Sequence, residues 1–280
     1  MSIKVKDIMI KDVVCATVPG SRDDVLKILK SERVSGVPVI KNRKLVGIVT
    51  RTDLLKHPDE EQLALIMTRD LITISPECNI SDAAKAILRG NIRRLPVVID
   101  DALIGILTVA DLVGAIANMD LKDSIEAYVQ SELVAIWEGT PIPVVMDILR
   151  LSNQEASPVL NSKGELVGII TERDLLDVSE IEDSVEKSDM SAASDGDAWA
   201  WESMRDTMNL YYSVSRIKLP EVPVKDVMIK DVIKAFRRSE ISDCAKKMRR
   251  NRVDQIPVVT AHNKLEGLLL DKNLIKILIK

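Results

Sequence analysis

The chain has 280 residues and a formal net charge of −4, and 46% of its residues are hydrophobic although aromatic residues are scarce. This length suits one large domain or two of ordinary size, with enough apolar residues for a substantial core. No apolar run reaches the length of a membrane span or a secretory signal, and three cysteines without a CxxC pair favour a reducing cytoplasm over disulfides.

The first sixty residues predict a helix, two strands and a second helix. The first helix is expected from Ser21, because Asp24 follows it at capping-box spacing. Apolar strands are expected at 37–40 and 45–49, with a polar turn between them. The segment 50–53 then lies where the second strand gives way to a helix.

This pattern occurs four times along the chain. The prolines of the four first strands, Pro38, Pro96, Pro158 and Pro257, lie 58, 62 and 99 residues apart. Two similar spacings and one long one indicate internal repeats with an insertion in the last gap. We divide the chain into repeat 1 (1–57), repeat 2 (58–120), repeat 3 (121–178), an acidic linker or insertion (179–222) and repeat 4 (223–280).

The insertion has two parts of different composition. Residues 177–206 contain ten acidic and two basic residues, and the segment 179–197 is expected to be a flexible linker. Trp201 and Tyr212 belong to a helix-like series that includes Met204 and Met208. Together with Trp199 and Tyr211 they predict either a latch that packs on the body or a contact for a partner.

A single repeat cannot bury both faces of its strands. Two repeats can pack their short sheets against each other with helices outside, so four repeats predict two pairs. The fold class is therefore α+β, with β-α-β-β-α repeats paired by pseudo-twofold symmetry. Clefts between paired repeats are where ligand sites commonly form.

The repeated motif resembles the CBS domain, first noted in cystathionine β-synthase. The resemblance rests on Gly36-Val37-Pro38-Val39 with Gly47-Ile48-Val49-Thr50-Arg51-Thr52-Asp53, and on the matching segments 95–98 with 105–111 and 157–160 with 168–174. It implies two Bateman modules, each a pair of repeats, as in the gamma subunit of AMP-activated protein kinase. It also implies a regulatory protein that binds AMP, ADP, ATP or an S-adenosyl compound between repeats.

Three repeats carry Thr-x-x-Asp at the end of the second strand. A carboxylate can accept both ribose hydroxyls, and a threonine hydroxyl three residues earlier can add a bond. The resemblance places phosphate groups beside the residues that precede the strand proline. The expected ribose ligands are Thr50, Asp53, Thr108, Asp111, Thr171 and Asp174. The expected phosphate ligands are Arg93 and Arg94, then Arg51 and Arg173, with Ser35, Gly36, Val37, Thr68 and Ala156 lining the clefts.

An interpretation without any ligand stands beside this one. Thr-x-x-Asp is also a capping box, which explains the three pairs as helix starts. In repeat 4, Leu270 and Asn273 replace threonine and aspartate, so a site there is expected to be weak or empty. In repeat 3, Glu155 would favour a nucleoside or a cationic S-adenosyl group over a triphosphate.

No catalytic constellation is recognisable. The sequence has no P-loop and no GxGxxG, and its two histidines, His57 and His262, form no metal-spaced cluster. We therefore expect a regulatory protein that is not an enzyme, without a metal, with a protein partner or a second copy. Two alternatives are an interaction scaffold with empty clefts and nucleic-acid binding through Lys246, Lys247, Arg249, Arg250 and Arg252. Arg249, Arg250 and Arg252 could also offset the acidic Asp254 in the cleft of repeat 4, or form a solvated helix face.

Overall fold

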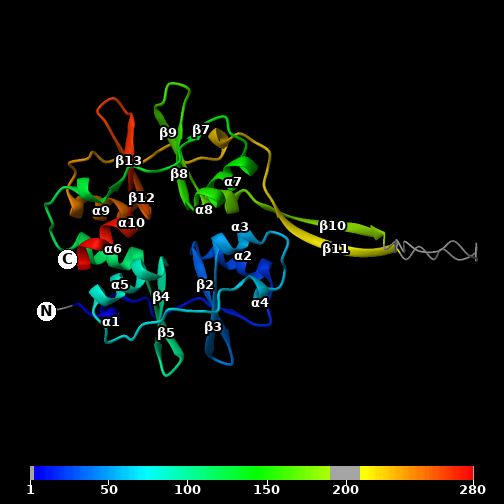
Figure 1. Cartoon of the computed structure of the whole chain (residues 1–280). Coiled ribbons are helices and arrows are strands. Elements are labelled where there is room, and N and C mark those ends of the chain that lie inside the picture. The colour runs from blue at the N-terminus through cyan, green and yellow to red at the C-terminus, as the bar shows by residue number, and fades with distance from the viewer. Residues whose placement is uncertain (1–2, 190–208, 280) are drawn as a thin grey trace, which may run out of the picture.

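The computed structural model describes residues 3–189 and 209–279. Repeats 1 and 2 form the lower half of the molecule in Figure 1, repeats 3 and 4 form the upper half, and a long ribbon leaves one side. Among the described residues, no helix is long and apolar enough to cross a membrane.

Each repeat is built around an antiparallel strand hairpin that is followed directly by a helix. The hairpin strands are apolar and pair over their whole length, from Gly36↔Thr50 to Lys41↔Lys44 in repeat 1. Repeat 1 comprises α1 (Val5–Ile8), β1 (Ala16–Thr17), α2 (Arg22–Ser31), β2 (Gly36–Lys41), β3 (Lys44–Thr50) and α3 (Arg51–Lys56). Repeat 2 comprises α4 (Leu63–Ile66), α5 (Ile80–Gly90), β4 (Arg94–Ile99), β5 (Ala102–Thr108) and α6 (Val109–Ala117).

Repeats 3 and 4 follow the same order, so the predicted fold class is confirmed. Repeat 3 comprises the 3-10 helix η1 (Ile125–Tyr128), β6 (Val129–Gln130), β7 (Ile136–Trp137), α7 (Ile142–Ser152), β8 (Ala156–Leu160), β9 (Leu166–Thr171) and α8 (Glu172–Asp177). Repeat 4 comprises η2 (Val224–Asp226), α9 (Ile241–Asn251), β12 (Gln255–Val259), β13 (Leu265–Leu270), α10 (Asp271–Leu274) and η3 (Ile275–Ile279).

The leading segment of each repeat, which is the stretch before its first long helix, pairs with the hairpin of the other repeat in the same module. Ile10 of repeat 1 bridges Ile106 of repeat 2, and Thr68 of repeat 2 bridges Ile48 of repeat 1. Repeats 3 and 4 do the same through β6 with β13 and through Ile229 with Ile169. A glycine lies at each crossing because the leading segment passes too close for a side chain; a Cβ on Gly105 would lie 2.9 Å from the Ile10 carbonyl oxygen.

Helices α3, α6, α8 and α9 lie between the two modules. Helix α6 packs on α9, and α3 packs on α8, so repeat 2 faces repeat 4 and repeat 1 faces repeat 3 (Figure 1). Two hydrophobic clusters run across this boundary, one joining repeats 2 and 4 and the other joining repeats 1 and 3. The helices on the outside of each pair are thus the surfaces through which the two modules pack.

The insertion forms a two-stranded antiparallel ribbon of β10 (Glu180–Asp189) and β11 (Asn209–Lys218). The expected flexible linker is therefore wrong over β10, where ladder pairing to a strand rich in β-forming residues overrides the polar composition. Tyr211 and Tyr212 lie in β11, so the helix-like spacing does not continue to Tyr212. The predicted positions Trp199, Trp201, Met204 and Met208 lie outside the described residues.

The base of the ribbon is fixed to repeat 1 by a fully buried arginine. The Arg22 guanidinium donates to the carbonyl oxygens of Pro58 and Ser215 at 2.6 and 2.9 Å, and to the Ser215 hydroxyl at 2.9 Å. The buried side chains of Ile217 and Leu219 join the core of repeats 1 and 3. The ribbon thus leaves the body from a rigid base.

Candidate functional site

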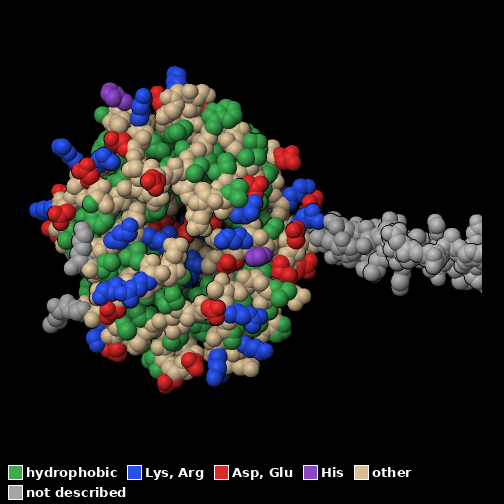
Figure 2. Space-filling model, in the orientation of Figure 1, with side chains coloured by type: hydrophobic (Ala, Val, Ile, Leu, Met, Phe, Trp, Pro, Cys, Tyr) green, Lys and Arg blue, Asp and Glu red, His purple; other side chains and the backbone are tan. Residues whose placement is uncertain are grey.

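A cavity of about 890 Å³ opens between the two modules. Its lining comes from the leading segment and β2 of repeat 1, from β4 to α6 of repeat 2, from Arg173 of repeat 3 and from repeat 4. Figure 2 shows a hollow at the centre of the molecule with lysine and arginine side chains around it. This volume lies within the range of small-molecule sites.

Thr108 and Asp111 lie in the wall contributed by repeat 2. The Asp111 Oδ2 atom accepts hydrogen bonds from the Thr108 backbone N–H at 2.8 Å and from the Thr108 hydroxyl at 2.7 Å. Burial raises the pKa of Asp111, against the lowering effect of these bonds. Oδ1 is outside these bonds, so the carboxylate keeps an acceptor for a ligand.

The capping-box interpretation is confirmed for all three Thr-x-x-Asp pairs. Thr50 with Asp53, and Thr171 with Asp174, repeat the 2.8 and 2.7 Å bonds of Thr108 with Asp111. Only Thr108 and Asp111 line the cavity. The three pairs therefore share one structural role, and a ligand role in this cavity is open to Asp111 alone.

Arg94 approaches the cavity across the boundary between repeats 1 and 2. Its guanidinium donates to the Ser35 hydroxyl at 2.7 Å, and a Cβ on Gly36 would lie 2.7 Å from the Arg94 Cζ atom. Arg94 is 9% exposed and forms no ion pair within the described chain. Burial, followed by the neighbouring Arg93, lowers the pKa of Arg94, as expected for a cation that lacks a counter-ion.

Arg173 and Arg51 add two further guanidinium groups near the centre. The Nε atom of Arg173 is buried without a hydrogen-bond partner, and Arg173 lines the cavity. Arg51 lies outside the lining and donates to the Val34 carbonyl oxygen at 2.8 Å. Burial, followed by the charge of Arg173, lowers the pKa of Arg51 to about 10. Clustered cations of this kind favour an anion.

Arg93 also lines the cavity, but its charge is already compensated. It forms ion pairs with Glu155 at 3.2 Å, with Asp254 at 3.3 Å and with the buried Asp271. The three carboxylates come from repeats 3 and 4. Burial raises the pKa of Asp271 against the opposing effect of Arg93. Arg93 thus joins the modules through carboxylates, and this leaves less of its charge for a phosphate group.

The cleft of repeat 4 departs from the others. Leu270 is the N-cap of α10 and offers no side-chain cap, and the following Asp271 binds Arg93. In repeat 4, the carboxylates of Asp254 and Asp271 are therefore bound to Arg93, and neither takes the place of the capping aspartate of the other repeats.

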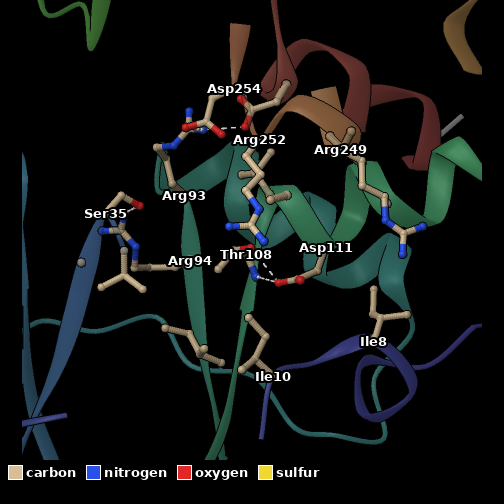
Figure 3. A pocket seen from close by; sticks show the side chains of 18 of the residues that line it. Ile8, Ile10, Ser35, Arg93, Arg94, Thr108, Asp111, Arg249, Arg252 and Asp254 are labelled. Carbon is tan, nitrogen blue, oxygen red and sulfur yellow. Dashed lines mark hydrogen bonds and ion pairs between the residues drawn. The ribbon is translucent and has the colours of Figure 1, made fainter. Parts of the chain in front are cut away.

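Apolar side chains form part of the cavity wall. Ile8 and Ile10 come from the leading segment, and Val34 and Ile106 from repeats 1 and 2. Figure 3 shows Arg252 reaching from repeat 4 toward Thr108 and Asp111, Arg249 extending beside them, and Ile8 and Ile10 on the other side. The cavity therefore combines an apolar side, a carboxylate and a cationic side.

Arg249 and Arg252 are two of the three arginines that could offset the acidic Asp254 of repeat 4. Both are exposed residues of the kind expected on a solvated helix face, yet both line the cavity. The Arg249 Cδ atom lies 3.8 Å from the position that a Cβ on Gly114 of α6 would take, so α9 and α6 are in close contact here. The Lys246 Nζ atom lies 3.8 Å from Asp243 Oδ1. Lys246, Lys247 and Arg250 do not line the cavity. Of the five basic residues considered for nucleic-acid binding, Arg249 and Arg252 thus line the cavity, whereas Lys246, Lys247 and Arg250 are exposed outside it.

The remaining predicted cleft residues have structural positions. Val37 is fully buried in β2, and Ala156 is 6% exposed at the start of β8. Thr68 exchanges backbone hydrogen bonds with Ile48. None of the three lines the cavity, whereas Ser35 and Gly36 do.

The four repeats and their shared hairpin-to-helix geometry define a known class of protein. The family model described as CBS domain matches residues 5–60, 62–118, 125–180 and 224–280. The chain therefore belongs to the CBS domain family and carries four copies of the domain.

Solved structures match almost the whole chain. One is an uncharacterized conserved protein from Pyrococcus horikoshii, with 30% identity, a TM-score of 0.66 and coverage of 99% of this chain and 100% of that one. Another is protein MJ1225 from Methanocaldococcus jannaschii, described as a candidate archaeal homologue of g-AMPK, with 22% identity, a TM-score of 0.78 and coverage of 98% and 99%. The second likeness concerns the fold.

A curated relative matches over a shorter segment. The uncharacterized protein MJ0188 of M. jannaschii is 35% identical over 123 residues. That segment spans 43% of this chain and 43% of the relative.

Proposed function

We propose that this protein is a regulatory sensor that binds an adenine nucleotide in the cavity at Asp111. The observation that carries the proposal is the meeting of Asp111, the apolar side around Ile8 and Ile10, and arginines from other repeats in one cavity. The carboxylate suits ribose hydroxyls, the apolar side suits a base, and guanidinium groups suit phosphate.

The arginines favour a phosphorylated ligand over a cationic one. Arg94 and Arg173 are buried or partly buried without a carboxylate partner among the described residues. Burying a cation without compensation is costly, so a bound anion would stabilise this arrangement. An S-adenosyl compound brings a positive sulfonium group and would meet these charges unfavourably in this cavity.

A route from ligand to partner is built into the chain order. Arg173 lies on α8, which ends at Asp177, and β10 begins at Glu180. A ligand that binds Arg173 would bias the position of α8 and hence the ribbon that follows it. We propose that the ribbon carries this change to a protein partner.

The three capping boxes supply a matched test of the site. Asp53→Ala, Asp111→Ala and Asp174→Ala each remove the same pair of cap bonds, at about 1 kcal/mol each. Calorimetric titration of wild type and variants with AMP, ADP, ATP, adenosine and S-adenosylmethionine should show nucleotide binding that is lost in Asp111→Ala and kept in Asp174→Ala. Loss in Asp53→Ala alone would move the nucleotide to the cleft of repeat 1. Binding of S-adenosylmethionine alone would support a methyl-metabolite sensor, and no binding by ligand-free wild type would support a scaffold.

A further inference from the structure

Two arginines of the cavity wall have a left-handed backbone. Arg33 has φ +55° and Arg252 has φ +54°, and both line the cavity. Residues with a Cβ atom rarely adopt this conformation, because the side chain approaches the carbonyl oxygen. The backbone therefore opposes arginine at these two positions.

The same position in the other two repeats is occupied by asparagine. Each of the four residues lies five positions before the strand proline, and Asn91 and Asn153 have φ +48° and +53°. Asparagine tolerates the left-handed region better than other residues with a Cβ. Neither Asn91 nor Asn153 lines the cavity. Arginine thus replaces the better-suited residue only in the two repeats where the position faces the cavity.

The wider pattern supports a functional reason for these arginines. The described residues include ten residues other than glycine with positive φ, of which seven are asparagine or aspartate. The other three are Arg33, Arg252 and Arg43, which lies in the turn between β2 and β3. A residue held against its backbone preference at a cavity wall indicates that its side chain has a role there.

The two side chains come from opposite modules. Arg33 follows α2 in repeat 1, and Arg252 is the C-cap of α9 in repeat 4. Neither forms an ion pair within the described part of the chain, and both are exposed at the cavity rim. Figure 3 shows the Arg252 guanidinium directed toward Thr108. Two free guanidinium groups at the rim suit the outer end of an anionic ligand.

We propose that Arg33 and Arg252 bind the outer phosphates of a nucleotide whose ribose is held at Asp111. The two arginines then determine how strongly the cavity prefers two or three phosphates over one, and the phosphate chain links repeat 1 to repeat 4. This inference rests on the function proposed above and adds the residues that select the ligand.

The test exploits opposite effects on binding and stability. In Arg33→Asn and Arg252→Asn, the side-chain charge is lost but the left-handed backbone is better suited. Calorimetric titration without added metal should show ADP and ATP binding weakened about 10-fold in each variant, with little change for AMP. The melting temperature of each ligand-free variant should rise by roughly 1–3 °C. Arg43→Asn is the control: it should show the same rise in melting temperature and unchanged nucleotide binding.

The failures of the two proposals are distinguishable. Wild-type affinity for ADP and ATP in both variants would overturn the role of these arginines and leave nucleotide binding at Asp111 intact. A melting temperature that falls in Arg252→Asn but rises in Arg43→Asn would show that the Arg252 side chain stabilises the fold, and would contradict the proposal that it is present to bind phosphate. Absence of nucleotide binding to wild type would overturn both proposals.

Discussion

The Thr52 hydroxyl of α3 lies 2.8 and 3.0 Å from the two carboxylate oxygens of Glu172 on α8, and this contact joins repeat 1 to repeat 3. Burial is the main cause that raises the pKa of Glu172 to about 7, with a further contribution from Glu155. The Thr52 bond, Arg51 and Lys56 act in the opposite direction. The boundary between the modules thus contains a carboxyl group that titrates near neutrality.

This contact predicts a pH dependence of stability. The folded pKa of about 7 exceeds the ordinary value of 4.5, so the folded chain binds more protons between these values. The stabilisation is complete below pH 4.5 and is lost as the pH rises through 7, by an amount on the order of 1–3 kcal/mol. Glu172→Gln should remove this part of the dependence, measured as the melting temperature from pH 5 to 8. Parallel curves for wild type and variant would contradict it.

The Arg93 ion pairs predict a large effect of removing one partner. Arg93→Met leaves the buried Asp271 without its cation, which should lower the free energy of unfolding by about 3–5 kcal/mol. Adding Asp271→Asn should recover a substantial part, because the uncompensated carboxylate is then gone. Urea unfolding at pH 7 measures both. Equal stability of the single and double variants would show that Asp271 does not depend on Arg93.

The close crossing at Gly267 predicts that even one methyl group is disruptive. A Cβ there would lie 2.6 Å from Val129 Cγ1 and 2.7 Å from the Gln130 carbonyl oxygen, so β6 would have to move away from β13. Gly267→Ala should lower the unfolding free energy by about 1–3 kcal/mol. Gly114→Ala is the control, since the nearest atom lies 3.8 Å away and alanine favours helix α6 by up to ~1 kcal/mol. An unchanged free energy of unfolding in Gly267→Ala would contradict this and would mean that β6 can move away from β13 at little cost.

The buried Arg22 predicts a local effect on the ribbon. Arg22→Met removes the donors that hold Ser215 and Pro58, which should cost about 2 kcal/mol and expose the base of β10 and β11. Hydrogen exchange should accelerate in the ribbon more than in the hairpins of repeat 4. Lys27→Met, at an exposed position of the same helix, should leave the exchange pattern unchanged. A uniform acceleration over the whole chain would indicate global destabilisation instead.

The sequence determined the repeats and their local structure. Pro38 and its three counterparts mark equivalent strands, and Thr50 with Asp53 caps a helix, because these features depend on neighbours within a few residues. Seven of the residues predicted for the site lie at one cavity: Ser35, Gly36, Arg93, Arg94, Thr108, Asp111 and Arg173.

Only the tertiary structure decided which of three equivalent capping boxes faces a cavity. Asp53, Asp111 and Asp174 are locally alike, but packing of α9 on α6 brings Arg249 and Arg252 to Asp111 alone. The strand β10 likewise depends on β11, whose paired residues lie between 20 (Asp189 with Asn209) and 38 (Glu180 with Lys218) positions further along the chain. Such contacts arise from packing between segments distant in the chain, so composition and spacing could not predict them.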